Sequence, residues 1–179
     1  MGFIQISLFS LFSGGKRVSK KKGRNRSPSA ALRARNTERG LKACVSDPAL
    51  KADWDRLIDC YFPERQDLKL YHVAWSRRRQ RRTLGSCNMT RKRVRMATEL
   101  NHPEFARWIE PVLYHELCHA VLGTEVFSRC GKRAWHGREF KSLEARHPDT
   151  QALNVWMRLG GWTRAVRSAR SRAMWKSRG

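Results

Sequence analysis

The sequence contains few acidic residues, no Cys-x-x-Cys pair and no long apolar run. Of its 179 residues, 15 are Asp or Glu against 38 Lys or Arg, which gives a formal net charge of +23. An odd number of cysteines, five, argues against a secreted disulfide scaffold, and their spacing argues against a cysteine-only zinc ribbon. No apolar run approaches the roughly 20 residues that span a bilayer, which excludes an ordinary integral membrane protein. These absences predict a cytoplasmic protein with reduced thiols, for which we assume a monomer.

The basic residues are concentrated in three segments. Residues 1–40 carry ten Lys or Arg and one acid, Glu38, while residues 77–95 carry nine and residues 158–179 carry seven, both with no acid. Runs of this kind are often only solvated faces. However, these segments hold the whole positive excess, and a sequence pI near 11.2 is high. An anionic partner, most commonly nucleic acid, is therefore the competing interpretation.

Composition divides the chain into three regions. Residues 1–45 form a basic extension that we expect to be disordered, because residues 16–39 are rich in Ser, Gly, Lys and Arg. Apolar residues 2–12 precede this basic stretch, so an interfacial anchor, an unusual export signal or a start codon assigned too early are alternatives. Residues 46–160 are expected to form the globular domain, and residues 161–179 a basic tail or helix.

The order of elements predicts an α+β fold. A helix is expected from Asp47-Pro48, followed by strands at 68–75, 83–87 and 91–97 and by helices at 111–123, 136–147 and 149–159. In the third strand, Arg91, Arg93 and Arg95 alternate with other residues and so share one face. We therefore expect a short three-stranded antiparallel or mixed sheet packed against helices.

One short motif points to chemistry: His115, Glu116 and His119 form an H-E-x-x-H sequence within the helix at 111–123. Residues four apart share a helix face, so both imidazoles can bind one zinc ion at about 2.0–2.1 Å. Glu116 is turned by about 100° from His115 and can reach a water on the metal. There a carboxylate acts as general base and then acid in peptide hydrolysis. The alternative is two ordinary histidines beside a solvated glutamate.

A catalytic zinc takes a third protein ligand and keeps its fourth position for water. Downstream candidates for the third ligand are Glu125, Cys130, His136, Glu139, Glu144 and His147. We favour His136, because it follows a loop long enough to turn the chain back and because Gly137 lets the backbone approach closely. Cys118, inside the motif, is expected to be a small buried apolar group.

At these residues the sequence resembles the SprT-like (Spartan-related) zinc metallopeptidases, a family that includes a protease of DNA–protein crosslinks. The matching stretch covers about residues 68–159 and includes Leu84-Gly85-Ser86-Cys87, Thr98-Glu99-Leu100-Asn101, His115-Glu116-Leu117-Cys118-His119-Ala120 and His136-Gly137-Arg138-Glu139-Phe140. The resemblance implies a small zincin-like domain whose sheet packs on the H-E-x-x-H helix. It also implies that His115, His119 and His136 bind Zn²⁺ and that Glu116 is catalytic. The cysteine-paired zinc ribbon of some relatives is not found in this sequence, nor is a recognisable partner-binding motif in its tail.

The leading hypothesis is a zinc-dependent peptidase that acts on protein substrates. In zincins generally the substrate lies extended beside an edge strand next to the metal, and here we expect that strand to be residues 91–97. Backbone pairing selects little by sequence, so cleavage must be controlled by access or recruitment. The alternative is a nucleic-acid-binding protein whose zinc site is structural or inactive.

Recruitment by DNA, single-stranded or damaged, is what the basic segments would supply, and it would associate the protein with the nucleoid. The candidate contacts are Arg77, Arg78, Arg79, Arg81, Arg82, Arg91, Arg93 and Arg95. The tail at 162–175 has apolar residues at helical spacing among arginines. It is interpreted either as a basic amphipathic helix on DNA or an acidic membrane, or as a last helix packed on the core.

Overall fold

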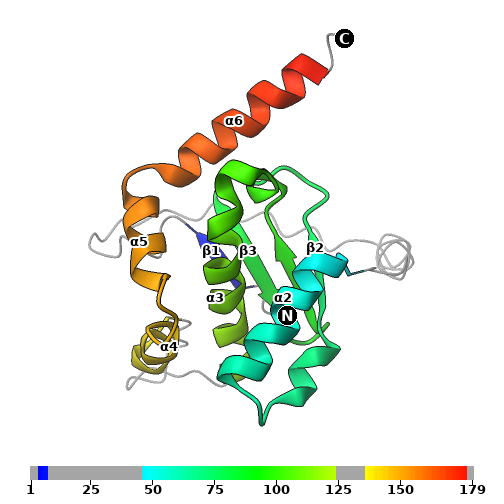
Figure 1. The fold of residues 1–179 in the computed structure, drawn as a ribbon, viewed down its shortest axis with the longest axis vertical. Coiled ribbons are helices and arrows are strands. Elements are labelled where there is room, and N and C mark those ends of the chain that lie inside the picture. The colour runs from blue at the N-terminus through cyan, green and yellow to red at the C-terminus, as the bar shows by residue number, and fades with distance from the viewer. Residues whose placement is uncertain (1–3, 8–45, 124–135, 177–179) are drawn as a thin grey trace, which may run out of the picture.

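The computed structural model describes residues 4–7, 46–123 and 136–176. A sheet is covered on one face by α2 (Pro48–Tyr61) and α3 (Ile109–Leu122), with α4 (Arg138–Glu144) and α5 (Thr150–Arg158) beside α3 (Figure 1). The last helix, α6 (Gly161–Lys176), runs away from this body (Figure 1). The predicted α+β class is confirmed. Within the described ranges, no helix has the length and apolar character needed to cross a membrane.

Helix α2 begins where its sequence predicts. The Asp47 carboxylate accepts a hydrogen bond from the Leu50 amide at 3.1 Å, and Pro48 occupies the first turn, where its missing N–H costs nothing. One face of the helix is buried, at Leu50, Trp54, Leu57 and Ile58. The Trp54 indole donates to the Leu68 carbonyl at 3.0 Å, which ties the helix to the chain that leads into the sheet.

The sheet contains four strands in the order β1-β3-β4-β2: β1 (Ile4–Ser7), β2 (His72–Trp75), β3 (Thr83–Asn88) and β4 (Arg93–Met96). Strand β3 is antiparallel to β4 and β1, whereas β2 is parallel to β4, so the mixed alternative is correct. The pairs Gly85–Met96 and Cys87–Val94 are buried toward α3. Their neighbours Ser86, Asn88, Arg93 and Arg95 occupy the opposite face.

Two predictions about strands need correction. The expected strand at 68–75 begins only at His72, because Gln66–Leu70 is a 3₁₀ helix that buries Leu68. The strand at 91–97 is not an edge, because β2 and β3 pair with β4 on its two sides. The predicted disorder of residues 1–45 lies outside the described residues except at 4–7, where β1 adds a fourth strand to the three expected.

Helix α3 is the centre of the domain. All ten residues from Pro111 to Ala120 are buried, and the helix ends at Gly123, whose φ of 68° favours glycine. Short 3₁₀ helices at Thr98–Leu100 and Pro103–Trp108 lead into it from the sheet. On its other side α5 packs Trp156 against Trp108, with ring centroids 4.9 Å apart. A charged motif inside so buried a helix therefore lies in the core of the molecule.

Helix α6 packs on the core at its first turns, as one of the two interpretations of the tail predicts. Its first turns pack on the core through Trp162, Ala165 and Val166, and the Trp162 indole donates to the Arg81 carbonyl at 3.1 Å. Its last described turns are exposed, with Met174 and Trp175 accessible at 57% and 77%. The helix is thus packed on the core at its first turns and exposed at its last described turns.

Candidate metal centre

Three histidines converge beside α3. His115 and His119 lie one turn apart on the helix, and His136 precedes α4 by two residues. Each offers a ring nitrogen, and these atoms all lie within 4.8 Å of one another. The Nε2 atoms of His119 and His136 are 3.1 Å apart. The three side chains are thus close enough to share one metal ion.

Phe140 on α4 supports all three rings. It is fully buried, and its ring centroid lies 4.8 Å from that of His115, 4.4 Å from that of His119 and 4.7 Å from that of His136. His136 immediately precedes the N-cap residue of α4 and Phe140 lies in the first turn of that helix, so both side chains lie against α3. Short α4 therefore holds the third histidine and also closes the apolar side of the cluster.

Glu144, at the end of α4, orients one of the histidines. Its Oε1 lies 2.5 Å from His115 Nδ1, while His115 Nε2 is buried and has no hydrogen-bond partner among the described residues. A carboxylate that holds the proton on Nδ1 leaves Nε2 as the atom free to bind a metal. The buried, unpartnered Nε2 and the all-imidazole donor set together fit a transition-metal ion such as zinc.

Replacing Glu144 by Ala should weaken metal binding without removing a ligand. We expect zinc affinity to fall by about 10–100-fold, the usual effect of losing a carboxylate behind a ligating histidine. Competition with a chromophoric chelator measures this, and Glu139→Ala, an exposed change on the same helix, is the control. Equal zinc affinity in the two variants would contradict the orienting role of Glu144.

Burial lowers the pKa of two of the three imidazoles, those of His119 and His136. Burial, with smaller contributions from His115 and His136, lowers the pKa of His119 to about 2. Burial and the neighbouring His115 lower the pKa of His136 to about 4. Neutral imidazole is the form that donates a lone pair to a metal, so the lowered pKa values of His119 and His136 suit metal binding.

Glu116 lies on the adjacent face of α3 and is completely buried. Neither carboxylate oxygen has a hydrogen-bond partner among the described residues, and burial raises the pKa of the carboxyl well above its usual value. It packs against β3 at Gly85, where an added Cβ would lie 2.6 Å from Glu116 Oε1. An unpartnered buried carboxylate is costly to maintain, which is typical of a functional group.

Substituting Gly85 by Ala tests this close approach. The new methyl group would lie 3.0 Å from Glu116 Cγ as well as 2.6 Å from Oε1, so the carboxylate must shift. Misplacement by about 1 Å costs a catalytic group about a hundredfold in rate, and we expect that loss in cleavage of a protein substrate with zinc content unchanged. Ser86→Ala, on the opposite sheet face, should retain both. Full activity in Gly85→Ala would contradict the placement of Glu116.

The other candidate ligands lie elsewhere. His147 is buried against Tyr114, with ring centroids 5.0 Å apart, and its Nε2 lies 3.4 Å from Glu110 Oε1. Glu139 is exposed, and Cys118 is buried with its thiol pKa raised by desolvation, as expected of an apolar group. Glu125 and Cys130 lie outside the described residues.

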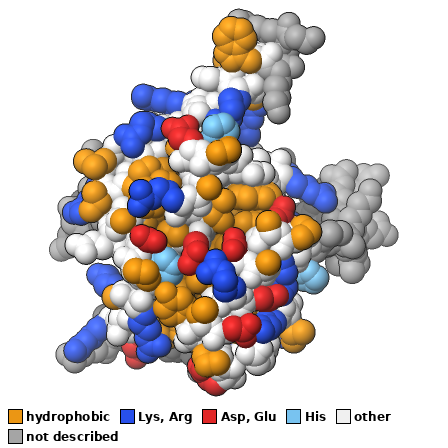
Figure 2. Space-filling model, viewed as in Figure 1, with side chains coloured by type: hydrophobic (Ala, Val, Ile, Leu, Met, Phe, Trp, Pro, Cys, Tyr) orange, Lys and Arg blue, Asp and Glu red, His pale blue; other side chains and the backbone are white. Residues whose placement is uncertain are grey.

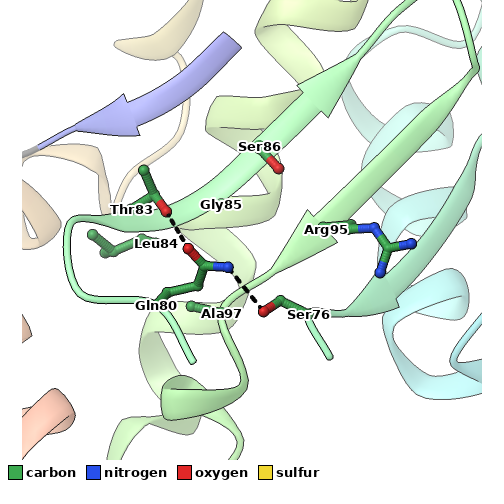
Figure 3. Close-up of a pocket in the computed structure, with 8 residues that line it drawn as sticks. All are labelled: Ser76, Gln80, Thr83, Leu84, Gly85, Ser86, Arg95 and Ala97. Atoms are coloured by element: carbon green, nitrogen blue, oxygen red, sulfur yellow. Dashed lines mark hydrogen bonds between the residues drawn. The ribbon is translucent and has the colours of Figure 1, made fainter. Parts of the chain in front are cut away.

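The candidate nucleic-acid contacts divide into two groups. Arg77, Arg78, Arg79, Arg81 and Arg82 are exposed on the basic loop (residues 77–82), and Arg91, Arg93 and Arg95 line a small pocket on the outer sheet face. Gln80 fixes the basic loop, because its backbone N–H donates a hydrogen bond to Glu99 Oε1 at 2.7 Å. Its side chain donates to Ser76 Oγ and accepts from Thr83 Oγ1 (Figure 3). The arginines of the basic loop are thus exposed side chains on a backbone that Gln80 anchors.

The basic loop and α6 form a groove that the sequence alone does not reveal. Arg79, Arg81 and Arg170 line one part of it, and Arg79 and Arg172 line the adjoining part. Glu99, at its base, is buried. On the face shown in Figure 2, by contrast, basic side chains are dispersed among acidic and apolar ones. Positive charge from two distant segments therefore converges between the basic loop and α6.

Comparison with known proteins identifies the family of the chain. The model of the SprT-like family matches residues 51–158, more than half of the chain and a range that includes α3, His136 and α4. Comparison with curated proteins and with solved structures gives no significant match. The family match suggests a metallopeptidase-type domain, in agreement with the α+β fold. The chain belongs to the SprT-like family.

Proposed function

We propose that this protein is a zinc-dependent endopeptidase in which His115, His119 and His136 hold the metal and Glu116 is the catalytic base. The observation that carries the proposal is the convergence of three ring nitrogens within 4.8 Å of one another, beside a buried carboxylate with no partner. Family membership supports the same type of domain. A zinc ion bound there would polarise the substrate carbonyl and lower the pKa of water.

The protein residues supply proton transfer and the positioning of the catalytic groups. Glu116 accepts a proton from the attacking water, whose oxygen bonds to the carbonyl carbon, and then delivers that proton to the departing amine as the C–N bond breaks. Gly85 lets this carboxylate lie against β3, and Glu144 orients His115. Phe140 packs against the three imidazole rings and keeps them in place.

A structural zinc site in a nucleic-acid-binding protein has less support. Structural sites are closed by four protein ligands, and within the described residues the cluster contains three. Such a site also has no use for an unpartnered carboxylate in the core. The test is cleavage of casein by the purified chain: a chelator should stop it and added zinc should restore it. If no cleavage occurs with zinc bound, the peptidase proposal fails.

Recruitment by DNA is the second part of the proposal, and the groove between the basic loop and α6 supports it. Four arginines line this groove, and Trp175 is exposed on the same helix. Cations that follow a backbone, with an aromatic ring for stacking, are the features of single-strand binding. A peptidase with little sequence selectivity would then act on proteins bound to DNA.

Replacing Arg79 and Arg170 by Gln should weaken binding to single-stranded DNA and reduce its salt dependence. Each phosphate contact contributes about 0.7 to the slope of log affinity against log salt, so two lost contacts should flatten it by about 1.4. Fluorescence anisotropy with a labelled oligonucleotide across a salt series measures the slope. The control removes the same charge elsewhere, with Arg138→Gln at the start of α4 and Arg146→Gln just after its end, both exposed. Equal effects of the two pairs would contradict a localised site.

A further inference from the structure

Strand β1 occupies the edge of the sheet next to β3, the strand against which Glu116 packs. It pairs antiparallel with β3, with Ile4 opposite Cys87, Gln5 opposite Ser86 and Ser7 opposite Thr83. Between these pairs it passes Gly85, the residue against which Glu116 packs. In the close-up of this region β1 runs alongside β3, with α3 behind the sheet (Figure 3).

This is the edge that an extended polypeptide would need in order to reach the site. The other side of β3 is paired with β4, and β4 is in turn paired with β2. A chain that adds to a sheet binds through main-chain hydrogen bonds to an unpaired edge. Among the described residues, an added strand at the level of Gly85 can be accepted only where β1 now lies.

The pairing of β1 with β3 is also short and irregular, as expected of a strand that can be displaced. It has four residues, and its register is irregular between Gln5 and Ser7, opposite the Gly85 region. Short strands with a bulge lose ladder hydrogen bonds at the irregularity. Residues 8–45 connect β1 to the domain in the same chain. This tether gives β1 a high effective concentration at the β3 edge, so it can compete there with another polypeptide although its own pairing is weak.

We propose that the segment Ile4–Ser7 is an internal competitor that occupies the polypeptide-binding edge of β3 and must leave before a substrate can bind there. The proposal rests on the peptidase function only for what happens to the bound chain afterwards. It places control of access in the N-terminal extension, separate from the arginines proposed to bind DNA. A partner that binds the extension would release the edge.

The test uses two adjacent prolines in the full chain, Gln5→Pro with Ile6→Pro. Alternate residues of an antiparallel strand donate to its neighbour, so one of the two prolines must remove an N–H that faces β3. The matched control, Gln5→Ala with Ile6→Ala, keeps both N–H groups. All chains also carry Glu116→Gln, so that binding is measured without cleavage. The probe is a fluorescent peptide with the sequence of residues 2–9.

We expect the proline variant to bind this peptide at least about tenfold more tightly than the alanine control, because the edge is no longer occupied by its own segment. Hydrogen exchange of the β3 amides should be faster in the proline variant and slow again when peptide is added. Equal peptide affinity in the two variants, or unchanged β3 exchange, would overturn the inference.

A final arm separates the inference from the proposed function. With Glu116 intact, the proline variant should cleave casein faster than the alanine control by a similar factor. If peptide binding and exchange change as expected but no variant cleaves casein with zinc bound, the inference stands and the peptidase proposal fails. If casein is cleaved equally fast by both variants, peptidase activity stands and the competition by β1 is refuted.

Discussion

Glu116→Gln is expected to abolish cleavage of casein while zinc content and melting temperature remain at the parent values. General base catalysis contributes about 10²–10⁴-fold, and glutamine has nearly the same shape but cannot accept the proton. The parent carboxylate makes no ion pair or hydrogen bond among the described residues, so its replacement by a neutral amide breaks no interaction there. The measurements are initial rates, metal analysis by mass spectrometry and thermal unfolding.

The control for this result is Glu110→Gln, on the same helix. Glu110 lies near the surface and pairs with Arg56 at 2.9 Å, so its neutralisation should leave cleavage unchanged. If Glu116→Gln retained the parent rate, Glu116 could not be the base. If it lost zinc as well as activity, its role would be structural support of the metal centre rather than proton transfer.

His119→Ala is expected to lose the metal. Zinc sites in small domains bind with about 10–16 kcal/mol, so removing one of three protein ligands should cost about 4 kcal/mol, or about a thousandfold in affinity. His115→Ala and His136→Ala should behave similarly. Because a metal that binds only the folded state stabilises it, these variants should also lose the rise in melting temperature that zinc gives the parent.

His147→Ala is the matched control, since His147 is as buried as His119, each being 2% exposed. It contacts Tyr61 and Tyr114 instead of the cluster, so it should lower stability without lowering zinc stoichiometry. Zinc loss in His147→Ala, together with full zinc in His136→Ala, would reassign the third ligand.

Local sequence signals predicted the helices well. The Asp47 cap, the stop at Gly123 and the placement of His115 and His119 on one helix face all follow from interactions within a few residues. His136 was the favoured third candidate on loop length, and the structure places it beside His119. Spacing could not show that Glu144 contacts His115 Nδ1, because the two differ by 29 residues and meet only when α4 packs on α3.

The sheet was harder to predict, because strand pairing is not local. The alternation correctly placed Arg93 and Arg95 on one face, opposite the buried Val94 and Met96, yet nothing in residues 93–96 shows that two strands flank them. The parallel partner β2 and the strand β1 both come from distant parts of the chain. The close contact of Gly85 with Glu116 likewise depends on how α3 crosses β3, which no residue pattern specifies.

X-ray absorption at the zinc edge of the purified full chain tests the central claim most directly. Three histidine ligands predict nitrogen or oxygen neighbours at about 2.0–2.1 Å, with the outer-shell scattering of three imidazole rings and no sulfur. The Glu116→Gln chain should give the same ligand shell, and His136→Ala should lose one imidazole. A sulfur neighbour at about 2.3 Å, or fewer than three imidazoles in the parent, would contradict the proposed centre.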